Sequence, residues 1–259
     1  MIISTSEAKL VVMSDLHLGN PFNRTKRLIV EFLIAAVDQE YSICINGDGL
    51  DIAQTSFVRL TREIPEVMSQ LRRAKRRGLN VFYCIGNHDI LLEHLLDDWG
   101  LFTIVPFLNV TSGAKRFHIQ HGHTYDPFYM GWPTTYEAGT YFARHVLDIW
   151  PRGYLLWMEM ERRVLPKLGG ASGIPGEPAT FVEAAREICR RGFDGVIFGH
   201  THHPGVIELP GGGVYVNTGS WLMRPHYAEI RDGELSLRSW TSADGLTEGS
   251  VTAGAEHRN

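Results

Sequence analysis

The sequence has few cysteines, no long hydrophobic run and no surplus of basic residues. Three cysteines in 259 residues are too few for the disulfide framework of a small secreted protein, and the N-terminal segment lacks a signal-peptide pattern. The longest apolar stretch, residues 28–37, contains Glu31 and is too short to cross a bilayer. A formal net charge of −4 disfavours long nucleic acid as a partner, because binding it requires many cationic side chains. We therefore expect a cytoplasmic protein, with peripheral membrane contact as an alternative.

The first part of the chain alternates short apolar runs with amphipathic segments. This pattern predicts strands at residues 10–13, 43–45 and 81–85, and helices at 26–37 and about 58–77. Later runs are short and β-branched, which predicts strands at 117–120, 196–198, 206–209 and 214–217, followed by a hairpin within 227–240. Strands alternating with helices, and then hairpin strands, predict an α/β fold in which helices cover a mixed sheet or a two-sheet sandwich.

Two segments depart from this pattern. Residues 124–178 are rich in aromatic residues and end in a stretch rich in glycine and proline, so we interpret them as a helical insertion in a domain spanning residues 1–240. Residues 241–259 are small, polar and nonperiodic, which predicts a disordered tail.

Metal-competent side chains follow five of the predicted strands. Asp15 and His17 stand two apart after the first strand, and His200 and His202 repeat that spacing late in the chain. Alternate residues of an extended segment point the same way, so each pair can face one site. Carboxylate, amide and imidazole donors suit borderline divalent metals such as Mn, Fe, Zn, Co or Ni. The predicted metal ligands are Asp15, His17, Asp48, Asn87, His121, His200 and His202.

The order of these motifs resembles that of the calcineurin-like metallophosphoesterases over residues 10–220. The matching motifs are Asp15-x-His17, Gly47-Asp48-x-x-Asp51, Gly86-Asn87-His88-Asp89, His121-Gly122-His123 and Gly199-His200-x-His202. The resemblance implies a four-layer α/β/β/α sandwich with two divalent metal ions, for which manganese is our first expectation. It assigns Asp15, His17, Asp48 and His202 to one ion, and Asp48, Asn87, His121 and His200 to the other.

The resemblance also implies roles for side chains that do not bind metal. His88 would stabilise the transition state or protonate the leaving oxygen, with Asp89 as a possible orienting partner and Asp51 as an acceptor for a ligand histidine. A turn or cap role for either carboxylate is an equal alternative. The candidate substrate-binding residues are Asn23, Arg24 and His123. The alternative is that they are simple surface residues or only flank ligands, as His203 also does.

Within the family, the chain looks most like the UDP-2,3-diacylglucosamine hydrolases. It shares Ser14-Asp15-Leu16-His17-Leu18-Gly19, an insertion after the His-Gly motif, and Val216-Asn217-Thr218-Gly219-Ser220-Trp221. That branch has Arg where this chain has His88 and Asp where it has His123, so the hydrolytic reaction carries over and the lipid substrate does not follow. The insertion aromatics either pack on the sandwich or form an apolar groove.

These observations predict an enzyme that hydrolyses phosphoester or pyrophosphate bonds by attack of a metal-bridging hydroxide. The expected partner is a small phosphoester substrate, with a lipid-linked nucleotide such as UDP-2,3-diacylglucosamine as the finer hypothesis. Alternatives are a phosphodiesterase acting on cyclic nucleotides or nucleic acid, a protein phosphatase, and a noncatalytic scaffold of the same fold. The sequence leaves the oligomeric state open.

Overall fold

The computed structural model describes residues 3–132, 173–222 and 224–241, together with scattered residues between 134 and 159. The predicted tail, apart from residue 241, lies outside the described residues. So do five large apolar residues of the predicted insertion: Tyr141, Tyr154, Leu155, Trp157 and Met158. Within the described part of the chain, no helix is both long enough and apolar enough to cross a membrane.

The strands form two mixed six-stranded sheets. The first sheet has the order β12 (Glu234–Ser239), β11 (His226–Arg231), β2 (Lys9–Met13), β3 (Ser42–Asn46), β4 (Val81–Cys84) and β5 (Thr103–Val105). The second has the order β1 (Ile3–Ser6), β6 (Leu108–Ser112), β7 (Lys115–Ile119), β8 (Gly195–Phe198), β10 (Val214–Asn217) and β9 (Gly205–Glu208). Strands β2 to β5 are mutually parallel, as are β7, β8 and β10.

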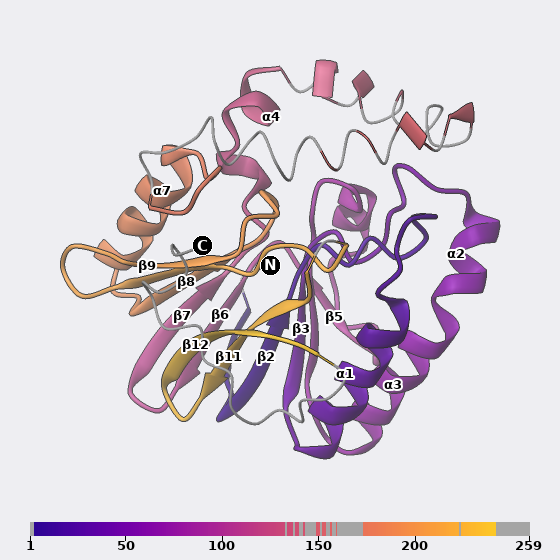
Figure 1. The fold of residues 1–259 in the computed structure, drawn as a ribbon. Helices are drawn as coiled ribbons and strands as arrows, with labels where there is room; N and C mark the ends of the chain where they lie inside the picture. Colours follow the sequence, from indigo (N-terminus) through magenta and orange to yellow (C-terminus); the bar gives the residue numbers. More distant parts are fainter. Residues whose placement is uncertain are drawn as a thin grey trace.

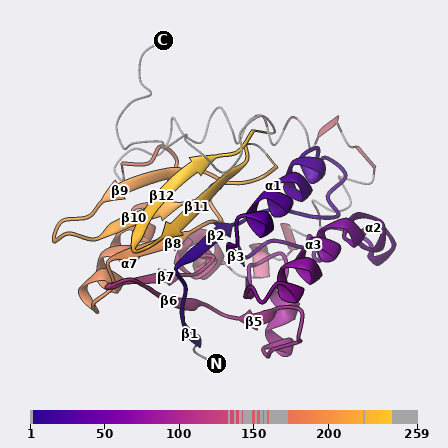
Figure 2. The ribbon, with the colours of Figure 1, turned by 90° about the horizontal axis from the view of Figure 1, so that it is seen from below.

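Alternating side chains divide the interior into layers. On β2, Val11 and Met13 belong to the core shared with α1 (Lys26–Asp38) and α3 (Pro65–Arg76), whereas Leu10 and Val12 belong to the core between the two sheets. The outer face of the second sheet is covered by α7 (Ala179–Arg190), which buries Phe181 against Phe198 and its neighbours. Figures 1 and 2 show helices on both outer faces of the paired sheets. The predicted four-layer α/β/β/α architecture is confirmed.

The single helix predicted over residues 58–77 is wrong, because the chain forms two helices there. Helix α2 (Phe57–Glu63) ends before Ile64, and α3 begins at Pro65. A proline has no backbone N–H and its ring clashes with the preceding turn, so it occupies the first turn of a helix rather than its interior. The strands and the helix that we did not predict are β1, β5, β6 and α7.

The carboxyl ends of strands from both sheets meet at one edge of the sandwich. Backbone hydrogen bonds join the loops that leave them: Asp15 N–H donates to the Gly47 carbonyl at 3.1 Å, and Gly199 N–H donates to the His121 carbonyl at 3.0 Å. Trp221 N–H donates to the Asp15 carbonyl at 3.2 Å and thereby joins the loop after β10 to the loop after β2. Each of the predicted metal-binding motifs lies in these loops.

Candidate metal centre

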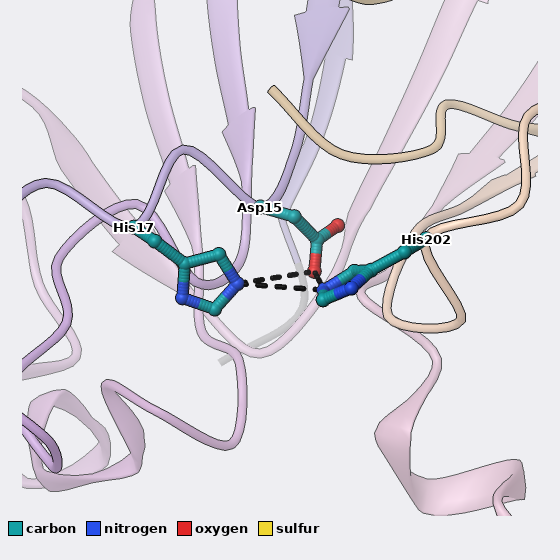
Figure 3. Close-up of side chains that lie close together, drawn as sticks. All are labelled: Asp15, His17 and His202. Atoms are coloured by element: carbon teal, nitrogen blue, oxygen red, sulfur yellow. Dashed lines mark hydrogen bonds and ion pairs between the residues drawn. The ribbon is translucent and has the colours of Figure 1, made fainter. Parts of the chain in front are cut away.

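The first group of candidate ligands consists of Asp15, His17 and His202 (Figure 3). Asp15 Oδ1 lies 3.2 Å from His202 Nε2 and 4.0 Å from His17 Nε2, and the two Nε2 atoms are 3.4 Å apart. Asp15 and His17 are buried, and Asp15 Oδ1 has no hydrogen-bond partner. A buried carboxylate oxygen without a donor, facing two imidazole nitrogens, fits a divalent cation.

The second group consists of Asp48, Asn87, His121 and His200. His121 Nε2 lies 3.4 Å from Asp48 Oδ2 and 3.2 Å from Asn87 Oδ1, while His200 Nδ1 lies 2.8 Å from Asn87 Oδ1. The potential ligand atoms of Asp48, His121 and His200 all lie within 4.8 Å of one another, and Asp48 is equally close to one ring nitrogen of His17. Asp48 therefore lies between the two groups, where a bridging ligand belongs.

The electrostatics of these groups favour positive charge. Burial opposes ionisation, but the His121 and His202 rings lower the pKa of Asp15 to about 2. Burial likewise opposes protonation of His121, but the charges of Asp48 and Asp15 raise its pKa to about 10. Burial together with the neighbouring charge of His88 lowers the pKa of His17 to about 4, so that ring stays neutral. Ionised Asp15 and the neutral ring of His17 are ready metal donors, whereas His121 would have to release its proton when a metal binds.

Five of the seven candidate ligands have a left-handed backbone. Their φ angles are 53° for Asp15, 45° for His17, 52° for Asp48, 69° for His200 and 63° for His202. A non-glycine residue in this region costs about 1–3 kcal/mol, and such residues cluster at functional sites. The side chains therefore do not converge through extended alternation, as the spacing suggested. In each of the pairs Asp15/His17 and His200/His202, both members are left-handed and one residue that is not left-handed lies between them.

His88 is paired with Asp51. Its Nδ1 lies 2.9 Å from Asp51 Oδ1, and the other carboxylate oxygen of Asp51 accepts a 3.0 Å hydrogen bond from Asn20 Nδ2. Burial would lower the pKa of His88, but the charges of Asp48 and Asp51 raise it to about 9. Asp89, the possible orienting partner named from the sequence, instead accepts hydrogen bonds from Gly86 N–H at 2.6 Å and Gly49 N–H at 3.0 Å.

The candidate substrate-binding residues differ in placement. Asn23 Nδ2 donates to the Leu16 carbonyl at 2.6 Å, so this side chain holds the loop after β2. Arg24 is exposed on that loop. His123 is buried with its ring 5.5 Å from the His121 ring, and His203 lies against Gly176.

Sequence reasoning missed two side chains that contact the second group. Asp126 Oδ2 lies 2.9 Å from His200 Nε2, and Asn87 Nδ2 donates to Tyr136 Oη at 3.0 Å. The sequence offers one signal for the first of these, because Asp followed by Pro127 is a typical helix start. Both side chains belong to the predicted insertion.

The residues of this site lie within a segment of the chain that matches a known protein family. A family model described as "Calcineurin-like phosphoesterase" matches residues 8–204. The chain belongs to this family. The chain is 28% identical to a UDP-2,3-diacylglucosamine hydrolase from Azotobacter vinelandii over 216 residues, which are 77% of this chain and 83% of the relative.

Solved structures with a similar fold include a dimetal phosphatase from Danio rerio. It is 13% identical to this chain, with a TM-score of 0.52, and the match covers 96% of this chain and 100% of the other. At that identity the likeness concerns the fold alone. A zinc-complexed Vps29 from Entamoeba histolytica is 16% identical over 94% of this chain and 98% of its own, with a TM-score of 0.43.

Proposed function

We propose that this protein is a dinuclear metal-dependent hydrolase of phosphoester or pyrophosphate bonds. The observation that carries the proposal is that Asp48 belongs to two groups of potential ligand atoms, one with His121 and His200 and one with His17 and His88. One metal would be held by Asp15, His17, Asp48 and His202, and the other by Asp48, Asn87, His121 and His200. Family membership supports the same reaction class.

Manganese is our first expectation for the bound metal, and the set of carboxylate, amide and imidazole donors also admits iron, zinc, cobalt or nickel. Two such ions, when bound, would polarise the phosphoryl oxygens and activate water as the nucleophile near neutral pH. The protein contributes their spacing, because the ligands come from loops of both sheets that are joined by backbone hydrogen bonds.

His88 is our candidate for the residue that acts on the substrate directly. Its Nδ1 is engaged by Asp51, so a ring protonated at Nε2 would donate from Nε2 to a phosphoryl or leaving-group oxygen. Its backbone N–H also donates to Asp48 Oδ1 at 2.8 Å, which holds the ring beside the proposed bridging ligand. The His88 side chain is 13% exposed and can therefore reach a bound molecule.

For the substrate we propose a small, lipid-linked nucleotide such as UDP-2,3-diacylglucosamine. The Azotobacter vinelandii relative carries the name of that activity. The insertion exposes large apolar side chains, among them Phe128, Trp132 and Trp150, which are 53%, 65% and 60% exposed. Of these, Phe128 packs against Tyr136, which contacts the candidate ligand Asn87. Exposed aromatic groups suit a substrate with an apolar part, and they are compatible with peripheral contact with a membrane.

The test is hydrolysis by manganese-loaded protein, followed by ³¹P NMR, with UDP-2,3-diacylglucosamine and bis-p-nitrophenyl phosphate as separate substrates. We expect turnover of both and loss of both in Asp48→Ala. Turnover of the chromogenic diester alone would reject the lipid substrate and leave the hydrolase. Protein that binds two metals and hydrolyses neither these compounds nor 2′,3′-cyclic nucleotides would reject the hydrolase and favour a noncatalytic role.

A further inference from the structure

Asp126 connects the start of the insertion to the second group of candidate ligands. It is the N-cap of α4 (Pro127–Gly131), and its Oδ1 accepts a hydrogen bond from Phe128 N–H at 2.8 Å. Its other oxygen, Oδ2, lies 2.9 Å from His200 Nε2. One carboxylate thus caps the helix and contacts the candidate ligand at the same time.

This contact determines which nitrogen of His200 is available for a metal. A carboxylate only accepts hydrogen bonds, so Nε2 carries the proton and Nδ1 keeps its lone pair. That Nδ1 is the atom 2.8 Å from Asn87 Oδ1, inside the second group. His121 is held in the corresponding way, with its Nδ1 2.9 Å from the Asn46 carbonyl and its Nε2 facing Asp48.

Tyr136 makes a second contact from the insertion to this group. Asn87 Nδ2 donates to Tyr136 Oη at 3.0 Å, which turns Asn87 Oδ1 toward His121 and His200. The Tyr136 ring packs edge-on against Tyr129 of α4, with centroids 5.1 Å apart. Two of the four candidate ligands of the second site are therefore oriented by residues of the insertion.

The far end of the insertion reaches the same loop. The buried Glu177 accepts hydrogen bonds from Thr201 Oγ1, Tyr215 Oη and Asn217 Nδ2. Thr201 lies between His200 and His202, so residues from both ends of the insertion contact one ligand loop. The position of that loop then depends on how the ends of the insertion dock.

We propose that Asp126 is a positioning residue for the second metal, holding His200 with Nδ1 toward the site so that metal retention depends on the docking of α4. The proposal rests on the proposed function insofar as it takes His200 as a metal ligand. Partners of this kind typically contribute about 10- to 100-fold to metal affinity.

The test is calorimetric titration of metal-free protein with Mn²⁺, comparing wild type with Asp126→Asn and Asp126→Ser. Asparagine keeps a cap acceptor for Phe128 N–H but presents an amide donor to His200, whereas serine keeps the cap and removes the acceptor. Asp98→Asn is the matched control, because Asp98 also accepts a hydrogen bond from a backbone N–H two residues ahead, at 2.8 Å, in an exposed turn.

We expect the Kd of one Mn²⁺ site to rise by about 10- to 100-fold in both Asp126 variants, with the other site unchanged. The control should titrate like wild type. In a phosphoester assay, the variants should need more Mn²⁺ for half-maximal rate and recover most of kcat at saturating Mn²⁺. A merely structural role for Asp126 would not produce this split.

Affinities at both sites within twofold of wild type would overturn the proposal, and so would equal weakening of both sites. If Asp126→Asn does not fold, Asp126→Ser tests the same proposal, because serine is a common N-cap residue of natural helices. If wild type binds two Mn²⁺ ions but hydrolyses no phosphoester, the proposed function fails while selective weakening would still support the positioning role.

Discussion

His88 Nδ1 lies 2.9 Å from Oδ1 of Asp51, whose side chain is fully buried. Asp51→Asn offers an amide in place of one acceptor oxygen, so it disturbs the orientation and protonation of His88 without removing a proposed metal ligand. We expect kcat to fall by about 10²-fold, toward the lower end of the range for general acid–base catalysis, with Mn²⁺ stoichiometry preserved. Steady-state kinetics and metal analysis on the same preparation check this, and an unchanged kcat would remove Asp51 from the mechanism.

Removing the His88 side chain tests the catalytic assignment itself. His88→Ala should retain both metals and lose about 10²- to 10⁴-fold in kcat, because the group proposed to act on the substrate is gone while the proposed ligands stay. Single-turnover kinetics at saturating Mn²⁺ make the measurement. Loss of bound metal in proportion to the lost rate would indicate that His88 is a ligand instead.

Removal of metal should destabilise the protein. A ligand that binds only the folded state at 1,000 times its Kd stabilises by about 4 kcal/mol, so excess EDTA should lower Tm, and Mn²⁺ should restore it. In Asp48→Ala the shared candidate ligand is missing, and most of the Mn²⁺-dependent rise should vanish. A Tm that does not respond to Mn²⁺ in wild type contradicts a metal centre.

Glu40 tests the cost of left-handed backbone away from the site. Glu40 follows the end of α1 with a φ of 62°. At the corresponding place after α3 the chain has Gly78, with a φ of 78°. Glu40→Gly should stabilise the fold by about 1 kcal/mol, and Gly78→Ala should destabilise it similarly, because a residue with a Cβ is strained at this φ. No atom lies within 4 Å of an added Cβ at Gly78, so the backbone conformation alone sets that change. Urea unfolding of the two variants measures both changes, and equal effects in the same direction would be inconsistent with this explanation.

The buried Glu177 predicts a pH-dependent stability. Burial raises its pKa from 4.5 to about 7, although hydrogen bonds from Thr201, Tyr215 and Asn217 oppose the shift. Because the folded pKa is the higher one, the stabilising contribution is complete below pH 4.5 and is lost as pH rises to about 7. Glu177→Gln, which cannot ionise, should therefore gain on the order of 3 kcal/mol relative to wild type between pH 4.5 and 8. Metal-free urea unfolding at both pH values measures this difference, and a constant difference would contradict it.

Much of the fold follows from local sequence signals. Short apolar or β-branched runs predicted β2, β3, β4, β8 and β10, because a strand that is buried on both faces has a nearly continuous apolar sequence. β1 was not predicted, because its residues alternate between partly buried and exposed without an apolar run. The break at Pro65 shows how helical periodicity can continue across two separate helices.

The sequence indicated which residues to consider for the site more readily than it indicated the contacts between them. Motif spacing brought together the metal-competent residues, but pairing of His88 with Asp51 depends on the tertiary arrangement of two loops. The left-handed angles at Asp15 and His202 carry no sequence signature beyond the tolerance of Asp and His for that region. Asp126 was missed for a similar reason, since only the fold brings α4 beside His200.

The two proposed metals would also connect the halves of the sandwich. Asp15, Asp48 and Asn87 follow strands of the first sheet, whereas His121, His200 and His202 follow strands of the second. A bound pair of ions would thus form a crosslink at one edge of an interface that is otherwise apolar. A substitution that disturbs the packing between the sheets, for example at the buried Phe117, would therefore also change the metal affinity at that edge.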